Sequence, residues 1–120
     1  SEALSDQGSA AALGARGRVR ADPGLTAALS GDATGLMVST DLFYDPRADL
    51  HDAWRAEGAL AIEMEAATLF RIGERRGIAV GCICVVSDLV SAGDPARIEE
   101  EALEEAAKRM GRAAAKALGA

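Results

Sequence analysis

Two acidic residues lie within or directly after apolar stretches of the sequence, where an acidic side chain is unusual. Glu65 lies in residues 62–76, whose apolar side chains recur with helical spacing, and it falls inside that apolar sector with Glu63 on its flank. Burying a carboxylate costs free energy unless the group is paired or binds a ligand. Glu65 is therefore a candidate ligand-binding residue. The alternative is an acid that satisfies the free backbone N–H groups at the start of a helix.

Asp88 is the second such carboxylate, because it follows the apolar run 78–86 and Ser87. The length of that run and its β-branched residues predict a buried strand of the parallel type. Ligands of open α/β sheets bind beyond the carboxyl ends of the strands. Asp88 is thus a candidate general acid. The alternative is that it only caps the turn that follows.

Phe43 and Tyr44 are two of the four aromatic residues, and they fall in the expected loop 40–47. Such a pair either stacks on a planar ligand or closes one edge of the core. His51 is the only histidine, and we assign it no role. The sequence has no CxxC pair, HExxH motif or glycine-rich phosphate loop, so no metal site is expected.

The elements that must position these residues follow an α/β rhythm. Asp22-Pro23 predicts a short helix through residue 29, residues 35–39 a strand, and residues 49–57 a helix closed by Gly58. The helix 62–76 should end at Gly77. A last helix should restart at Asp94-Pro95. The buried face expected for it comprises Ile98, Ala102, Ala106, Met110, Ala113 and Ala117.

The first 34 residues show little pattern, and residues 5–9 read as a turn. Helix, buried strand and helix in succession predict a single α/β domain over residues 1–120.

Cys82 and Cys84 alternate on the predicted strand, which places them on one face about 6.6 Å apart. A disulfide between them would be strained, so we expect two free thiols in an intracellular, cytoplasmic protein.

The amino-acid composition and net charge limit the kinds of molecule that the protein is expected to bind. The 120 residues are 49% hydrophobic but only 3% aromatic, and the net charge is −6. An acidic balance disfavours binding to nucleic acid. No apolar run is long enough for a membrane span, and no signal peptide is expected. The sequence begins without Met in a Ser/Ala/Gly-rich stretch, which suggests a fragment or a processed chain.

Three stretches carry a family resemblance: residues 39–46 (STDLFYDP), 62–67 (IEMEAA) and 84–88 (CVVSD). In this register they resemble the hexameric branch of the nucleoside phosphorylase family, which includes bacterial purine nucleoside phosphorylase and uridine phosphorylase. The resemblance is strong over residues 38–88, and the chain corresponds to the C-terminal half of that fold. It implies an α/β, three-layer-like architecture with a central, mostly parallel or mixed sheet flanked by helices.

The resemblance also implies a role for individual residues. Glu65 would accept hydrogen bonds from the ribose 2′ and 3′ hydroxyls, Met64 would pack on the sugar, and Glu63 would support the site. Phe43 would stack on the base. Asp88, with Ser87 beside it, would protonate or hydrogen-bond a purine at N7. The implied reaction is phosphorolysis of a purine nucleoside, with phosphate as co-substrate and no cofactor.

The sequence departs from the family in two places. Family members often carry an Arg on the last helix that helps the catalytic Asp, but Glu101 stands at the gapless position. Arg97 is the nearest substitute, expected in the first turn of that helix. The family's phosphate site belongs to the missing N-terminal half, and the cluster Arg16, Arg18 and Arg20 precedes the wrong elements to replace it. We therefore expect weak phosphate binding and little turnover from these residues alone.

Several alternatives stay open. A uridine phosphorylase usually lacks the aspartate and reads the pyrimidine with Gln and Arg, a pair not found here. A hydrolytic nucleosidase shares the Met-Glu and Ser-Asp motifs but rarely the Asp-Leu-Phe-Tyr stretch. A noncatalytic domain that binds nucleoside or assembles with a partner is the third reading. The resemblance further implies a homo-oligomer, a hexamer built from dimers, or association with an N-terminal half.

Overall fold

A computed structural model describes residues 2–5, 8–47, 49–90 and 96–120. Its centre is a four-stranded sheet of β1 (Glu2–Ser5), β2 (Gly17–Arg20), β3 (Leu36–Ser39) and β4 (Ala59–Glu63), in the order β2-β1-β3-β4. β1 pairs antiparallel with β2 and parallel with β3, and β3 pairs parallel with β4. This mixed sheet flanked by helices confirms the expected α/β class.

Residues 2–20, part of the N-terminal stretch that showed little pattern in sequence, include β1, α1 (Gly8–Ala12) and β2. They are short and rich in Ala and Gly, so neither a strand nor a helix period is visible. Their inward side chains are small, and Ala3 and Ala10 are buried in the core. The turn expected over residues 5–9 gives way to the end of β1 and the start of α1, with residues 6–7 outside the described part.

Helix α4 (Ala66–Arg76) packs across β1, β2 and β3 and carries Phe70, the largest fully buried side chain. Gly77 ends it in the left-handed conformation at φ 64°, as expected. The prediction that this helix begins at residue 62 is wrong, because Ala59–Glu63 forms β4. Parallel pairing with β3 supplies backbone partners for this stretch, and its side chains alternate in exposure.

The predictions for two short helices are confirmed. In α2 (Pro23–Ala28) the Asp22 carboxylate accepts the Leu25 backbone N–H at 2.8 Å, and Pro23 occupies the first turn. α3 (Leu50–Ala56) is followed by Gly58 at φ 85° and leads into β4.

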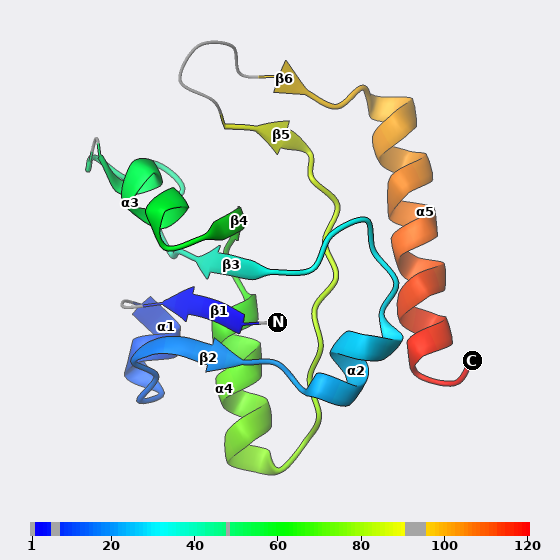
Figure 1. Cartoon of the computed structure of the whole chain (residues 1–120), viewed down its shortest axis with the longest axis horizontal. Coiled ribbons are helices and arrows are strands. Elements are labelled where there is room, and N and C mark those ends of the chain that lie inside the picture. Colours follow the sequence, from blue (N-terminus) through cyan, green and yellow to red (C-terminus); the bar gives the residue numbers. More distant parts are fainter. Residues whose placement is uncertain (1, 6–7, 48, 91–95) are drawn as a thin grey trace.

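The prediction of a buried strand over residues 78–86 is wrong. This segment belongs to neither sheet and is only partly buried. It runs between the four-stranded sheet and α5 (Glu100–Ala117) to reach β5 (Asp88–Leu89), as Figure 1 shows. Its backbone is anchored near its ends, where the Asp22 N–H donates to the Val80 carbonyl and the Ile98 N–H to the Ser87 carbonyl, each at 2.8 Å.

The last helix also differs from expectation. Asp94 and Pro95, its predicted start, lie outside the described residues, and α5 begins at Glu100. Arg97 is not in the first turn of α5 but in β6 (Ala96–Arg97), which pairs antiparallel with β5. Of the expected buried face only Ala106 is fully buried, and Ala102 is exposed. The face is incomplete because α5 stands against α2 and not against a continuous sheet.

The molecule is a flat body of 41 × 39 × 20 Å, with α5 along one side and α1 and α4 on the sheet (Figure 1). Within the described residues, no helix is both long enough and apolar enough to cross a bilayer.

Candidate active site

Glu63 at the end of β4 is the capping carboxylate of α4. Its Oε2 accepts the backbone N–H groups of Glu65 at 2.8 Å and Ala66 at 2.6 Å. The Ser39 hydroxyl donates to Glu63 Oε1 and accepts the Ala67 N–H at 2.8 Å. Two side chains therefore satisfy three of the otherwise free N–H groups at the start of α4. The ends of two parallel strands and the start of a helix are fixed together here.

Met64 and Glu65 lie in the turn that this network holds, and both are exposed. Glu65 is the residue that precedes α4, and its side chain makes no capping hydrogen bond to the helix. Its Oε2 accepts only a long bond from the Met64 N–H, at 3.3 Å. The expectation that Glu65 lies inside an apolar helical sector is wrong, because β4 and a turn replace the first helical turn. The capping role considered for Glu65 belongs to Glu63.

Phe43 and Tyr44 point into solvent from the loop after β3, with 77% and 89% of their surfaces exposed. Their rings meet edge to face, with centroids 4.9 Å apart and planes at 81°. The alternative that they close one edge of the core is therefore wrong. An exposed aromatic face is free to stack on a flat ligand.

Two aspartates shape this aromatic loop. Asp41 accepts the Ser9 N–H at 2.9 Å, and any side chain at Gly8 would overlap the Asp41 carboxylate. Asp45 accepts the Arg47 Nε at 2.9 Å, Nη2 at 2.6 Å and backbone N at 3.0 Å. These bonds from the Arg47 side chain and then its backbone hold the pKa of Asp45 at about 2, below its ordinary value.

Asp88 lies in a second group, at an open depression of about 350 Å³ lined by residues of β5, β6 and the positions next to them. The Ser87 hydroxyl donates to Asp88 Oδ2 at 2.7 Å, and the Arg97 guanidinium faces Asp88 Oδ1 at 3.6 Å. The β5–β6 pairing opposes Asp88 and Arg97 directly. The structure thus brings Ser87, Asp88 and Arg97 together, although Arg97 reaches Asp88 from a strand and not from the helix.

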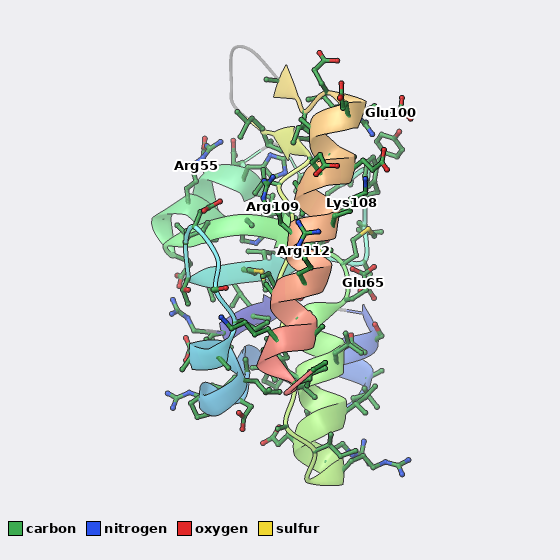
Figure 2. The ribbon with its side chains drawn as sticks, turned by 90° about the vertical axis from the view of Figure 1, so that its right-hand side faces the viewer. Arg55, Glu65, Glu100, Lys108, Arg109 and Arg112 are labelled. Atoms are coloured by element: carbon green, nitrogen blue, oxygen red, sulfur yellow. The ribbon has the colours of Figure 1, made fainter. Side chains whose placement is uncertain are left out.

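Arg55 on α3 is a residue that the sequence reasoning missed. Its Nη2 donates to the Val90 carbonyl at 3.0 Å, and its Nη1 is paired with Asp52 at 2.5 Å. It thereby ties α3 to the chain just beyond Asp88. Figure 2 shows Arg55 and Glu65 on opposite sides of the ribbon. No periodicity marks such a contact, since an exposed arginine on a short helix has no distinctive pattern.

Among the residues that the structure describes, no hydrogen bond or ion pair joins the two groups of site residues. Ser39, Glu63, Met64 and Glu65 form one network, and Ser87, Asp88 and Arg97 form the other. In the described ranges no cluster of three or more His, Cys, Asp or Glu side chains is arranged to hold a metal ion. His51 packs beside the Trp54 ring, with centroids 5.6 Å apart.

The N-terminal arginines are engaged with the protein. Arg18 is paired with Glu2 at 3.4 Å and Glu57 at 3.1 Å, and Arg20 with Glu2 at 3.1 Å. Arg16 donates to the carbonyl of Ala15 at 2.7 Å. These contacts bind the edge of the sheet to the loop after α3, which is a structural arrangement and not an open anion site.

Comparison with known proteins gives a family match over nearly the whole chain. The family profile described as "Phosphorylase superfamily" matches residues 4–119. A guanosine phosphorylase of Halorubrum lacusprofundi is 40% identical over 75 residues, 62% of this chain and 31% of the relative. A DeoD-type purine nucleoside phosphorylase of Actinobacillus pleuropneumoniae is 36% identical over 69 residues, 58% of this chain and 29% of the relative. The matched segments span less than a third of these curated relatives.

Proposed function

Because this chain belongs to the phosphorylase superfamily, we propose that it supplies the ribose- and base-binding part of a purine nucleoside phosphorylase. The reaction would cleave the N-glycosidic bond of a purine ribo- or deoxyribonucleoside with phosphate. Its products would be the free base and ribose or deoxyribose 1-phosphate. The relatives named for guanosine and purine nucleosides support a purine over a pyrimidine. No cofactor is part of this proposal.

The single observation that carries the proposal is the Ser87–Asp88–Arg97 group at its open depression. Cleavage of the glycosidic bond leaves positive charge on the sugar and negative charge on the departing base. A carboxylic acid at Asp88 that gives its proton to N7 relieves the charge on the base. Arg97, 3.6 Å from that carboxyl group, compensates the carboxylate that remains.

The first network serves the sugar in this proposal. Glu65 is exposed and lacks a capping bond to α4, so its oxygens are open to the 2′ and 3′ hydroxyls of ribose. Glu63 and Ser39 fix the turn that presents it, which limits the entropy lost when the sugar binds. Met64 packs on the sugar, and Phe43 stacks on the base from the aromatic loop.

No hydrogen bond or ion pair joins the two groups in the part of the chain that the structure describes, so the proposal includes an assembly that completes the site. The partner is either a second copy, as in a hexamer built from dimers, or an N-terminal half that brings the phosphate site. The two free thiols agree with a reducing compartment such as the cytoplasm.

Ligand binding tests the proposal independently of turnover. We expect guanosine to bind the complete assembly in calorimetry and to shift NMR signals of Glu65, Phe43 and Asp88, with uridine binding more weakly. Glu65→Gln removes a charged acceptor and should weaken guanosine binding roughly tenfold or more, since hydrogen bonds to charged groups contribute about 1.5–3 kcal/mol. Glu101→Gln on α5 is the matched control and should bind normally. Equal affinity of the two variants would overturn the assignment.

Phosphorolysis in the complete assembly tests the chemistry. Asp88→Asn should lower kcat for guanosine by about 10²-fold or more with little change in affinity, because it removes the proton donor. Release of base without phosphate at the same rate would instead identify a hydrolytic nucleosidase.

A further inference from the structure

The sulfur atoms of Cys82 and Cys84 lie within contact distance of each other. Their Sγ atoms are 3.5 Å apart, and both thiols are free. A paired strand would hold the two α-carbons about 6.6 Å apart, near the upper end of the separations that disulfides bridge. The segment 78–87 belongs to neither sheet, so no ladder of hydrogen bonds fixes that spacing.

Both thiols are reachable by small molecules. Cys82 is half-buried and Cys84 is exposed. They line an open cavity of about 780 Å³ between the sheet, the 82–86 segment and α5, with Met37, Leu60 and Ala106 among its other walls. This space is far larger than a peroxide, and it does not include Asp88 or Arg97.

From this geometry we propose that Cys82 and Cys84 are a dithiol site that a hydroperoxide oxidises to a reversible disulfide within the chain. The site lies outside both groups of candidate catalytic residues. The charges of Glu63 and Glu65 act to raise the pKa of both thiols, but neither carboxylate lines this cavity, and the thiols can be tested without substrate.

The two thiols have different chemical roles. The hydrogen bond from Cys82 lowers the pKa of Cys84 to about 7. That same bond and then partial burial raise the pKa of Cys82, so Cys82 keeps the proton. The thiolate is the nucleophile in thiol chemistry. Cys84 is therefore the attacking residue and Cys82 the resolving residue.

The reaction balances in two steps. The Cys84 thiolate attacks one peroxide oxygen, the O–O bond breaks, and the other oxygen leaves with the electron pair and takes a proton from water. This forms a sulfenic acid on Cys84. The Cys82 sulfur then attacks the Cys84 sulfur, the S–O bond breaks, and the hydroxide leaves as water with the Cys82 proton. Two thiols are oxidised by two electrons, and one peroxide is reduced.

Closure needs a local movement and no refolding. The sulfur atoms must approach from 3.5 Å to about 2.05 Å. The nearest backbone anchors of this segment are at Val80 and Ser87, which leaves the residues between them to adjust. A strained disulfide with one exposed cysteine is readily reduced, so the oxidised form should return to the dithiol with dithiothreitol.

Hydrogen peroxide and intact-mass measurement test the site. The reduced chain should lose the mass of two hydrogen atoms and both titratable thiols. No disulfide should form between chains, and dithiothreitol should restore both thiols fully. Retention of both thiols, or linkage only between chains, would overturn the proposal. So would direct conversion of Cys84 to the sulfinic acid.

The matched variants separate the two roles. In Cys82→Ser the oxidation should stop at a sulfenic acid on Cys84 that dimedone traps. Cys84→Ser should react with peroxide several-fold more slowly at pH 7 than Cys82→Ser. Partial burial still raises the pKa of the Cys82 thiol that remains, whereas the serine hydroxyl in Cys82→Ser can still donate a hydrogen bond to Cys84. The circular dichroism spectra of both variants should match that of the parent chain. Equal rates of reaction with peroxide in the two folded variants would show that Cys84 is not the attacking thiol.

Discussion

At the scale of single residues, the position of a carboxylate relative to a helix start decides its role. Glu63 and Glu65 are two residues apart, yet Glu63 binds the backbone of α4 and Glu65 is exposed without a capping bond. The sequence identified both residues as candidates but placed them within a helix. The error is physical, because parallel pairing of β4 with β3 is a contact between distant segments and leaves no periodic trace.

This difference predicts unequal effects of two alanine substitutions on the free energy of unfolding. Glu63→Ala removes the acceptor of two backbone N–H groups and one hydroxyl, so it should lower the free energy of unfolding by about 1–3 kcal/mol. Glu65→Ala should change it by less than about 0.5 kcal/mol. Urea denaturation followed by circular dichroism measures both. A Glu65→Ala chain as unstable as Glu63→Ala would mean that the capping roles are wrongly assigned.

The ion pair of Asp45 leads to a prediction about how the stability of the loop depends on pH. The pKa of Asp45 is lowered to about 2 by its bonds with Arg47, so the folded loop favours the ionised form. The stabilisation is present above the ordinary value of about 3.9 and is lost as the pH falls towards about 2. NMR titration of the Asp45 side-chain carbon should show this midpoint. In Arg47→Ala the midpoint should rise towards the ordinary value, and an unchanged midpoint would contradict the assigned cause.

At the scale of elements, the sequence predicted α2, α3 and the end of α4 because local chemistry determines them. The Asp22-Pro23 cap, the stops at Gly58 and Gly77 and short helical runs depend on neighbours a few residues away. Residues 78–86 have the composition of a buried strand but no strand partner. The composition of a segment indicates that it should be buried, but it does not show which segment will pack or pair with it. The structure of residues 78–86 therefore could not be predicted from their own sequence.

The hydrogen bond from Arg55 to the Val90 carbonyl links α3 to the chain after β5, and this link can be tested by itself. Arg55→Ala should release the chain after Asp88 from α3, since it removes the donor to the Val90 carbonyl. We expect amide exchange at Leu89 and Val90 to quicken several-fold, with loss of global stability within about 1 kcal/mol. Arg75→Ala, an exposed arginine near the end of α4, is the control. Equal exchange in the two variants would show that Arg55 does not hold this segment.

At the scale of the whole molecule, the core is small for the chain. Its buried side chains are mostly alanine around Phe70, and the radius of gyration is 14.8 Å, against about 13.6 Å for a compact chain of this length. An open cavity of about 780 Å³ is lined by residues of the sheet, the 82–86 segment and α5. The family resemblance correctly indicated the α/β class and the superfamily, but it gave no information on how completely these residues would pack together.

The loose packing of the chain and the ion pairs of its N-terminal arginines lead to a prediction about activity. The chain by itself should cleave guanosine at a rate close to background, with or without phosphate. Arg18 and Arg20 are paired with Glu2 and Glu57, and no hydrogen bond or ion pair among the described residues joins the Glu65 and Asp88 networks. The Glu2 and Glu57 carboxylates beside these exposed arginines offset their positive charge, which disfavours phosphate binding there. Release of guanine measured with and without phosphate, together with phosphate titration followed by phosphorus NMR, checks both parts. Phosphate binding in the micromolar range, or turnover of several per second from this chain alone, would mean that the anion site is already present in these residues.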